Sequence, residues 1–346
     1  MPLQKRARIF SSFPALDGVA ARIPGCAHVY IGADESIGAS LRLAWRAYRS
    51  ADYLVFNIDH RRLLLTCALY WLIGPRPLRR CRIVSVDILL RPPRSLEARP
   101  AALLKRLLLK QVDTFLLYFR NTDGYTRHFG IPKERMTYVA FKVNSWEKLE
   151  ARRGVIPEGD YVLLAGATLR DRATFVEAVR EAGMPAVLLV PGDERAAVEQ
   201  TAWYRAGLPP NLRLDYHTDG KEETYLGYHE NARIVCLPRY KWDIASTGIS
   251  SYLCAMGLGK CVVISRGPGA EDLLLENESA VFFEPENAED LARVLKDAWE
   301  RHEHRRRIAA NGARYAKSLA GEERLLEDIL AALGLPHGPG HRSVRI

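Results

Sequence analysis

The sequence predicts an α/β protein of two doubly wound domains, each a parallel sheet with helices on both faces. The chain has 346 residues, more than the ~250–300 that one hydrophobic core commonly supports. Short apolar runs alternate with helical patterns along almost the whole chain, as is typical of βα units. Many of these runs are apolar at every position, as expected of strands buried on both faces of a parallel sheet. We expect a cleft between the domains.

In the first half of the chain, helical patterns at residues 37–49 and 122–129 separate apolar runs. The predicted strands are residues 7–12, 27–32, 52–58, 82–88, 114–119 and 136–141. A segment rich in charge, Gly and Pro follows at residues 151–159. We therefore place the domain boundary there and assign residues 1–155 to the N-terminal domain.

The second half repeats the scheme. The predicted strands are residues 161–165, 186–190, 212–217, 233–237, 261–265 and 280–283. The helices predicted between and after them are residues 172–182, 193–204, 222–231, 249–257, 270–275, 288–301, 305–318 and 322–333. We assign residues 156–318 to the C-terminal domain, 319–335 to a closing helix and 336–346 to a flexible tail.

Composition narrows the class of protein. The chain is 48% hydrophobic and 26% charged, which is ordinary for a globular protein. The longest uncharged apolar run, residues 63–73, has eleven residues, whereas a membrane-spanning helix needs about 17–25. The N-terminus lacks the pattern of a secretory signal, so we expect a cytoplasmic protein. None of the six cysteines forms a Cys-x-x-Cys pair, so we expect no metal site.

Charge is distributed unevenly. Residues 1–158 hold 27 Lys and Arg against 13 Asp and Glu, a net charge of +14, and the remaining residues hold 23 against 28, a net charge of −5. The basic half should meet an anionic partner. Nucleic acid fits poorly, because no nucleic-acid-binding motif is present and aromatic residues do not alternate with the basic ones.

The basic half also contains two apolar segments flanked by cations. Arg79 and Arg80 follow the apolar run at residues 63–73. Lys105, Arg106 and Lys110 accompany four leucines that share one face of a predicted helix. This pattern is typical of a helix lying in an anionic membrane surface, at the inner face of the cell membrane. A core helix with solvated lysines is the alternative.

The segment 238–265 carries the clearest chemical signal, since it runs strand, polar loop, helix, turn and buried strand. Ser246, Thr247 and Gly248 stand where the helix begins. The unpaired N–H groups and the positive end of a helix form an anion site suited to a diphosphate. A plain helix cap by Ser or Thr is the alternative. Neither GxxxxGK[ST] nor GxGxxG occurs, which disfavours a P-loop protein and a dinucleotide-binding dehydrogenase.

The stretch CAMGLGKCVVIS, followed by GPGAEDLLLENESAVFFEPENAEDLARVL, resembles the C-terminal domain of GT-B glycosyltransferases, most of all family 4. The similarity extends over residues 160–318. It implies two Rossmann-like domains that face a central cleft and a nucleotide-sugar donor, UDP-sugar most of all, without a resident cofactor. No Asp-x-Asp triplet is present, which agrees with metal independence.

The resemblance also assigns residues of the C-terminal domain. It implies that the loop with Gly166, Thr168 and Arg170 holds the donor diphosphate, because guanidinium binds phosphate oxygens bidentately. It places His217 and Thr218 near the nucleobase. The remaining candidates near the donor are Arg239, Asp272 and, as a catalytic residue, Glu271. A plain helix start is the alternative for Arg170 and for the acidic pair, and a solvated loop histidine is the alternative for His217.

Two departures and two N-terminal candidates complete the prediction. The family's two Glu residues, spaced eight apart, correspond here to Ser246 and Cys254. Asp87 and His60 each follow a predicted strand and could bind or deprotonate an acceptor hydroxyl. Asp59 is an alternative to His60, and a structural role is the alternative for the histidine. We expect a metal-independent, retaining transfer to a glycan or lipid-linked acceptor. The alternatives are an epimerase-like sugar-nucleotide enzyme and a non-catalytic protein that binds nucleotide-sugar or membrane.

Overall fold

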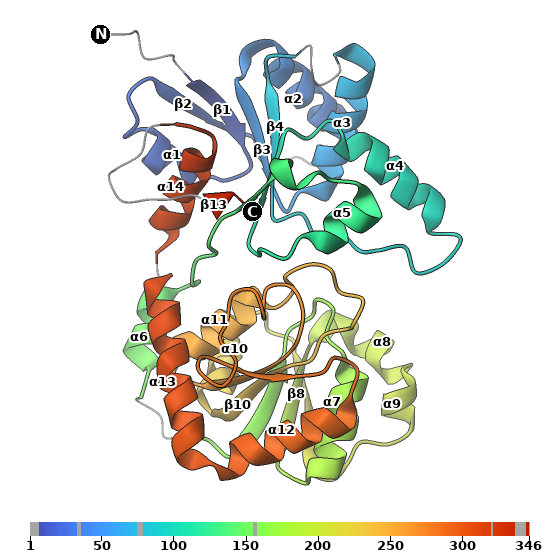
Figure 1. The fold of residues 1–346 in the computed structure, drawn as a ribbon, viewed down its shortest axis with the longest axis vertical. Coiled ribbons are helices and arrows are strands. Elements are labelled where there is room, and N and C mark those ends of the chain that lie inside the picture. The colour runs from blue at the N-terminus through green and yellow to red at the C-terminus, as the bar shows by residue number, and fades with distance from the viewer. Residues whose placement is uncertain are drawn as a thin grey trace. The chain divides into compact units, whose positions relative to one another are not determined.

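A computed structural model describes residues 7–32, 36–74, 79–154, 158–319, 321–335 and 344–345. The chain forms two compact units (Figure 1). Unit 1 comprises Met1–Ala140 together with Glu322–Ile346, and unit 2 comprises Phe141–Gly321. Each unit is an α/β layer structure built on one largely parallel sheet, so the predicted doubly wound fold is confirmed.

Unit 1 holds a seven-stranded sheet in the order β13-β6-β5-β4-β3-β1-β2. All its strand pairs are parallel except β13 with β6. The strands are β1 (Ala7–Ser11), β2 (Cys26–Tyr30), β3 (Tyr53–Asn57), β4 (Arg82–Val86), β5 (Thr114–Leu117), β6 (Met136–Tyr138) and β13 (Val344–Arg345).

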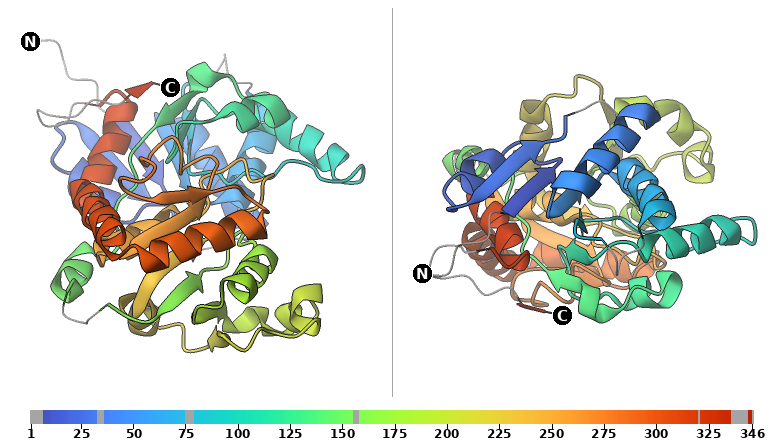
Figure 2. Two further views of the ribbon diagram at one scale, coloured as in Figure 1. Left: turned by 60° about the horizontal axis from the view of Figure 1, so that its bottom comes forward. Right: turned by 90° about the horizontal axis from the view of Figure 1, so that it is seen from above.

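The helices of unit 1 are α1 (Leu16–Ala20), α2 (Ile37–Ser50), α3 (His60–Ile73), α4 (Arg99–Leu109), α5 (Asp123–Phe129) and α14 (Glu322–Ala332). α1 packs on α14, while α2, α3, α4 and α5 pack in succession against one another (Figures 1 and 2). The chain runs from β1 to β2 on one side and then returns to β3 on the other side of β1. Because crossovers between parallel strands are right-handed, α1 and the α2–α5 series lie on opposite faces of the sheet.

Unit 2 holds a six-stranded parallel sheet in the order β12-β11-β10-β7-β8-β9. The strands are β7 (Tyr161–Ala165), β8 (Ala186–Pro191), β9 (Leu212–His217), β10 (Ala232–Leu237), β11 (Cys261–Ser265) and β12 (Val281–Phe283). The central strands are buried almost throughout, which explains why their sequences are apolar at nearly every position.

The helices of unit 2 are α6 (Trp146–Arg152), α7 (Arg172–Ala182), α8 (Arg195–Glu199), α9 (Ala202–Arg205), α10 (Glu222–Glu230), α11 (Ile249–Gly257), α12 (Ala288–Glu300) and α13 (His302–Ser318). α7 and α12 pack together over a core cluster that includes Phe175 and Leu291. α11 packs on α13. The helix predicted at 193–204 is broken by a turn into α8 and α9.

The units divide the chain elsewhere than at the predicted boundary of residue 155. α6 belongs to unit 2, because Leu149 packs against Gly257 and Arg153 Nε donates to the Gly257 carbonyl at 2.7 Å. The predicted closing helix returns to unit 1, where the Tyr53 hydroxyl donates to the Leu333 carbonyl at 2.8 Å. Within the predicted tail, only β13 lies among the described residues.

Candidate functional site

The carboxyl edge of the unit 2 sheet brings two sequence-distant segments together. β7 and β10 are neighbours at the point where the strand order reverses, and ligands of doubly wound sheets bind outside the carboxyl ends of the strands at such a point. The segments that leave these strands meet there. Arg170 and Arg239 form an antiparallel bridge, and the Asp171 N–H donates to the Pro238 carbonyl at 3.0 Å.

Arg170 is a buried cation at this edge, with its side chain lying against Gly166 and Gly248. Nη1 donates to the Thr168 carbonyl at 3.0 Å, and Nη2 donates to the Ser251 hydroxyl at 3.2 Å. Nε is buried without a hydrogen-bond partner. Burial lowers the pKa of Arg170 to about 10, and among the described residues no carboxylate forms an ion pair with it.

A buried guanidinium with an unsatisfied donor and no paired carboxylate favours an anionic ligand, because an uncompensated buried charge is costly. The Arg170 arrangement, and not its position in the sequence alone, therefore supports the predicted anion site. Thr168 contributes its carbonyl oxygen to orient the guanidinium. Gly166 has a positive φ of 107°, a conformation that glycine adopts at little cost.

The N-terminus of α11 reaches the same place without a side-chain cap. Gly248 is its N-cap residue, with φ 101°, and no side chain caps the helix. The Thr247 hydroxyl instead donates to Asp243, and Ser246 is buried against Gly269. The alternative of a plain Ser or Thr cap is therefore wrong, and the positive end of the helix lies beside Arg170.

Arg239 fastens the polar loop after β10, although its Nε, like that of Arg170, is buried without a hydrogen-bond partner. Its Nη1 donates to the Pro268 carbonyl at 2.7 Å and, at 3.4 Å, to the carbonyls of Ala245 and Thr247. It also forms a buried ion pair with Asp243, whose Oδ2 lies 3.7 Å from Nη1. Arg239 thus holds the polar loop after β10 in shape. Sequence reasoning missed Asp243, whose only signal was a carboxylate four residues before Thr247.

The acidic pair at 271 and 272 lies in consecutive turns, so the predicted helix at 270–275 is wrong. Glu271 is exposed, accepts from the Gly267 N–H at 2.9 Å and pairs with Arg266 at 3.2 Å. Asp272 accepts from the Gly269 N–H. Gly267 and Gly269 both have positive φ, which shapes a loop that the two carboxylates then fasten. Both carboxylates are therefore engaged in shaping this loop.

His217 and Thr218 lie at the carboxyl end of β9, the edge strand two places from β7. The distance between neighbouring strands is about 4.8 Å, so they stand about 10 Å along the edge from β7. His217 Nε2 is 3.0 Å from the Lys221 carbonyl. Tyr225 contacts both His217 and the Arg170 site. Its ring lies 6.2 Å from that of His217, and its hydroxyl bonds Ser251, which in turn bonds Arg170. Sequence reasoning missed Tyr225.

In unit 1, Asp87 follows β4 directly and His60 begins α3 after β3. Asp87 has a positive φ of 50°, and its Oδ1 is buried without a partner. Burial raises the pKa of Asp87 to about 7. Burial, Lys105 and Arg91 lower the pKa of His60. Strained backbone and a shifted carboxyl pKa are features that gather at functional sites.

Two further buried oxygens without partners lie at the same edge of unit 1. Asn57 Oδ1 belongs to the last residue of β3, and Thr122 Oγ1 to the N-cap of α5 after β5. β3, β4 and β5 are neighbours. The carboxyl edge of unit 1 therefore holds three polar groups that can receive a ligand.

The predicted membrane-contact residues divide into two groups. Lys105 and Arg106 of α4 and the C-cap Lys110 are exposed. Arg80 is exposed but pairs with Asp52 at 2.9 Å. Arg79 does not reach the surface, because its side chain is 1% exposed and pairs with Asp113. The prediction for Arg79 is therefore wrong, and the residue instead joins the segment before β4 to the segment before β5.

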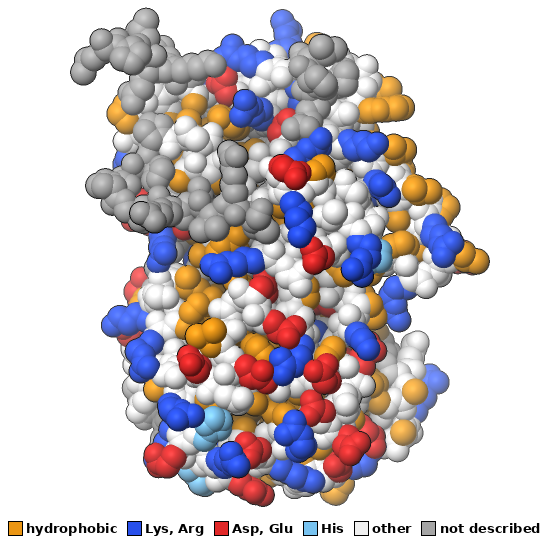
Figure 3. Space-filling model, in the orientation of Figure 1, with side chains coloured by type: hydrophobic (Ala, Val, Ile, Leu, Met, Phe, Trp, Pro, Cys, Tyr) orange, Lys and Arg blue, Asp and Glu red, His pale blue; other side chains and the backbone are white. Residues whose placement is uncertain are grey.

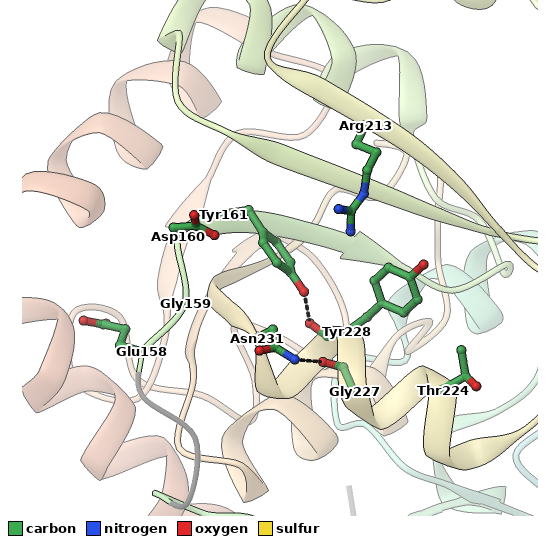
Figure 4. Close-up of a pocket in the computed structure, with 9 residues that line it drawn as sticks. All are labelled: Glu158, Gly159, Asp160, Tyr161, Arg213, Thr224, Gly227, Tyr228 and Asn231. Atoms are coloured by element: carbon green, nitrogen blue, oxygen red, sulfur yellow. Dashed lines mark hydrogen bonds between the residues drawn. The ribbon is translucent and has the colours of Figure 1, made fainter.

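A cavity of about 670 Å³ opens in unit 2, away from the carboxyl edge of its sheet (Figure 4). Its lining includes Asp160 and Tyr161, where β7 begins, and Arg213 near the start of β9. Tyr161 donates to the Tyr228 carbonyl at 2.7 Å, so part of the polar lining is satisfied internally. The cavity shares no residue with the predicted donor site.

The described residues contain no group of three His, Cys, Asp or Glu side chains arranged to hold a metal ion. They also contain no helix that is long and apolar enough to cross a membrane.

Comparisons with known proteins agree with this architecture. The family model for glycosyl transferases group 1 matches residues 174–315. No curated protein matches the chain. The structure of Alr3699/HepE from Anabaena in complex with UDP is similar, with a TM-score of 0.64, 14% identity, and coverage of 95% of this chain and 99% of that chain.

Two further solved structures share the fold. Sucrose-phosphate synthase from Thermosynechococcus elongatus has a TM-score of 0.63 and 14% identity, with 90% of this chain and 83% of that chain covered. UDP-N-acetylglucosamine 2-epimerase has a TM-score of 0.51 and 11% identity, with 96% and 99% covered. Residues 174–315 thus match the family of glycosyl transferases group 1, and the chain shares the two-sheet GT-B fold of these solved structures.

Proposed function

We propose that the chain transfers a sugar from a nucleotide-diphosphate-sugar, most of all a UDP-sugar, to a glycan or lipid-linked acceptor. The transfer is metal-independent and retains the anomeric configuration. The observation that carries the proposal is the buried Arg170 beside the uncapped start of α11. UDP complexes of Alr3699/HepE, which shares the fold, support the choice of donor.

The donor's diphosphate binds at the carboxyl edge of unit 2. Arg170 Nε, which has no partner within the protein, donates to a phosphate oxygen, and the helix end adds positive potential. Charge-assisted hydrogen bonds of this kind are short and strong. Gly248 has no side chain, which lets a phosphate approach the backbone.

The same groups stabilise the leaving group during transfer. The acceptor oxygen forms a bond to the anomeric carbon, and the bond from that carbon to the diphosphate oxygen breaks. The nucleoside diphosphate leaves with the electron pair, and Arg170 and the α11 dipole stabilise its growing negative charge. These fixed charges supply what a metal ion would otherwise supply, which is the basis for proposing metal independence.

Unit 1 supplies the acceptor site in this proposal. Asp87 accepts the proton of the acceptor hydroxyl, since burial raises its pKa to about 7, close to the value that suits a general base at neutral pH. His60 binds the acceptor near Lys105 and Arg91. We also place the protein peripherally on the inner face of the cell membrane, where a lipid-linked acceptor would be presented.

Isothermal titration calorimetry with UDP tests the donor site. Arg170→Ala should weaken UDP binding about 10- to 100-fold, because a charge-assisted hydrogen bond contributes about 1.5–3 kcal/mol. Arg180→Ala is the matched control, since Arg180 lies exposed on α7 and pairs with Glu177. Equal UDP affinity in both variants would overturn the assignment of Arg170.

Product analysis separates the proposal from its alternatives. A transferase releases UDP from a UDP-sugar and forms a glycoside with the acceptor. An epimerase would return an isomeric UDP-sugar, and a non-catalytic protein would bind UDP-sugar without turnover. The described carboxylates Glu271 and Asp272 are fastened within their loop, so the donor edge of unit 2 does not favour epimerase chemistry.

A further inference from the structure

Unit 1 exposes an unusual set of large apolar side chains on α3 and α4. Trp71 is 62% exposed and Leu72 is 74% exposed at the end of α3. Leu103, Leu104 and Leu107 are exposed on α4, and Leu96 is exposed just before it. We call these six residues the apolar edge. Hydrophobic side chains lie along the rim of unit 1 over α3 and α4 (Figure 3).

The apolar edge excludes the alternative that α4 is a core helix. Leu109 is the one buried residue of α4, although leucines recur along the helix at helical spacing. The leucine face of the amphipathic helix therefore points to solvent. Large exposed apolar patches on a folded protein mark interaction surfaces, because leaving them in water is unfavourable.

The surrounding charge selects the kind of partner. Neither α3 nor α4 contains an Asp or Glu, whereas α4 carries Arg99, Lys105 and Arg106. A second copy of this chain docked through the same face would bring two faces that carry these cations together, because a two-fold interface uses the same patch of both copies. Like charges at such an interface oppose association. A partner that is apolar in its interior and anionic at its surface matches both the exposed apolar side chains and the cations of α4.

We propose that the apolar edge inserts into the interface of an anionic bilayer, with the cations of α4 at the level of the lipid phosphates. α4 has eleven residues and is about 16 Å long, so it lies in the plane of the membrane. Trp71 sits at the boundary, where indole rings concentrate. This inference deepens the proposed function, on whose lipid-linked acceptor it rests, and it identifies which side chains of the apolar run at residues 63–73 are exposed.

Flotation of the full chain with vesicles tests this surface. One set of vesicles is pure phosphatidylcholine, and the other is an equal mixture of phosphatidylcholine and phosphatidylglycerol. The protein should float with the mixed vesicles at low salt and much less with the pure ones. Lys105→Gln with Arg106→Gln should weaken binding about 25-fold, since each cation near an anionic membrane contributes about fivefold.

Apolar substitutions test the insertion itself. Leu103→Ser combined with Leu107→Ser should weaken vesicle binding by about tenfold or more, because the inserted apolar area is lost. Leu275→Ser is the matched control, as Leu275 is equally exposed but lies in unit 2. All variants should keep the wild-type melting temperature, because the replaced side chains are exposed.

Three outcomes would overturn the inference. The first is no binding to mixed vesicles at low salt, and the second is binding that neither pair of substitutions changes. The third is a dimer in sedimentation equilibrium that the leucine substitutions dissociate, which would make the face a contact between copies. UDP affinity is measured on the same variants. Intact UDP affinity with lost flotation concerns the membrane face alone, whereas lost UDP affinity with intact flotation concerns the donor site.

Discussion

The Arg170 guanidinium lies directly against Gly248, and a Cβ at Gly248 would stand 3.1 Å from Arg170 Nη2. Gly248 also has a φ of 101°, which residues with a Cβ adopt at a cost. One glycine therefore satisfies two requirements at the start of α11. It allows the backbone to turn into the helix, and it leaves room for the buried cation.

Gly248→Ala should consequently weaken UDP binding by about tenfold or more, because the added methyl displaces Arg170. Gly183→Ala is the matched control for backbone strain. Gly183 ends α7 with a φ of 76° and has open space around its Cβ position. Both variants should lose about 1–2 kcal/mol of stability, but only Gly248→Ala should change the UDP affinity measured by calorimetry. An equal affinity loss in both would disprove the role of the Arg170 contact.

Asp243→Asn tests the loop behind the donor site. Asp243 bonds the Thr247 hydroxyl and the Ala245 N–H and pairs with buried Arg239. Removing the charge leaves Arg239 without its carboxylate, which should cost about 3 kcal/mol in the free energy of unfolding. We expect weaker UDP binding with an unchanged stoichiometry. Thr247→Ser should keep near-normal UDP affinity because it keeps the hydroxyl that bonds Asp243, whereas Thr247→Val should weaken UDP binding.

The regular elements were predictable because strands and helices carry local patterns. β7, β11, α7 and α11 begin and end where the apolar runs and helical spacing predict. The turns at 270–275 were not, since a Pro-Gly-Ala-Glu sequence also suits a helix start, and the positive φ of Gly267 and Gly269 appears only in three dimensions. The packing of α14 in unit 1 depends on long-range contacts such as the hydrogen bond between the Tyr53 hydroxyl and the Leu333 carbonyl.

The candidate site was predictable where a residue type implies its chemistry. Gly248 stood out as a glycine at a predicted helix start, and the family resemblance pointed to Arg170 as the cation of the loop that follows a predicted strand. Asp243 and Tyr225 did not, because their importance lies in partners brought close by the fold. Arg79 was misplaced for the same reason, as its burial against Asp113 leaves no mark in a local pattern.

The ion pair of Glu158 with Arg305 should govern the acid stability of unit 2. Arg305 Nε and Nη2 donate to the two carboxylate oxygens at 2.7 and 2.9 Å, and Arg305 is 1% exposed. Arg305 lowers the pKa of Glu158 below its ordinary 4.5. The pair therefore stabilises the fold above that value, and its contribution is lost as the pH falls through the lowered pKa.

Glu158→Gln should cost about 3 kcal/mol at pH 7, because a buried cation is left without its charge partner. The difference from wild type should shrink in acid, as both proteins then carry a neutral side chain at 158. Urea unfolding of the full chain at pH 7 and in acid measures this difference in the free energy of unfolding. Glu150→Gln is the matched control, since its pair with Lys317 is exposed and should contribute less than about 1 kcal/mol.

The titration of Asp87 should change stability and activity in opposite directions as the pH rises. Burial raises its pKa from the ordinary 3.8 to about 7, so the folded chain holds the proton more tightly than the unfolded chain. Stability should therefore fall as the pH rises from about 4 to 7. If Asp87 accepts the acceptor's proton, kcat should rise over the upper part of this range, with an apparent pKa near 7.

Asp87→Asn separates the two effects. Asn cannot ionise and tolerates the left-handed backbone at φ 50°, so the variant should melt higher than wild type at pH 8. Its kcat should fall about 100-fold or more, because general base catalysis contributes about 10²–10⁴, and the pH dependence near 7 should disappear. Asp123→Asn is the control, as Asp123 is exposed and pairs with Lys133. A pH–rate profile that Asp87→Asn leaves unchanged would remove Asp87 from the reaction, because the titrating group would then lie elsewhere.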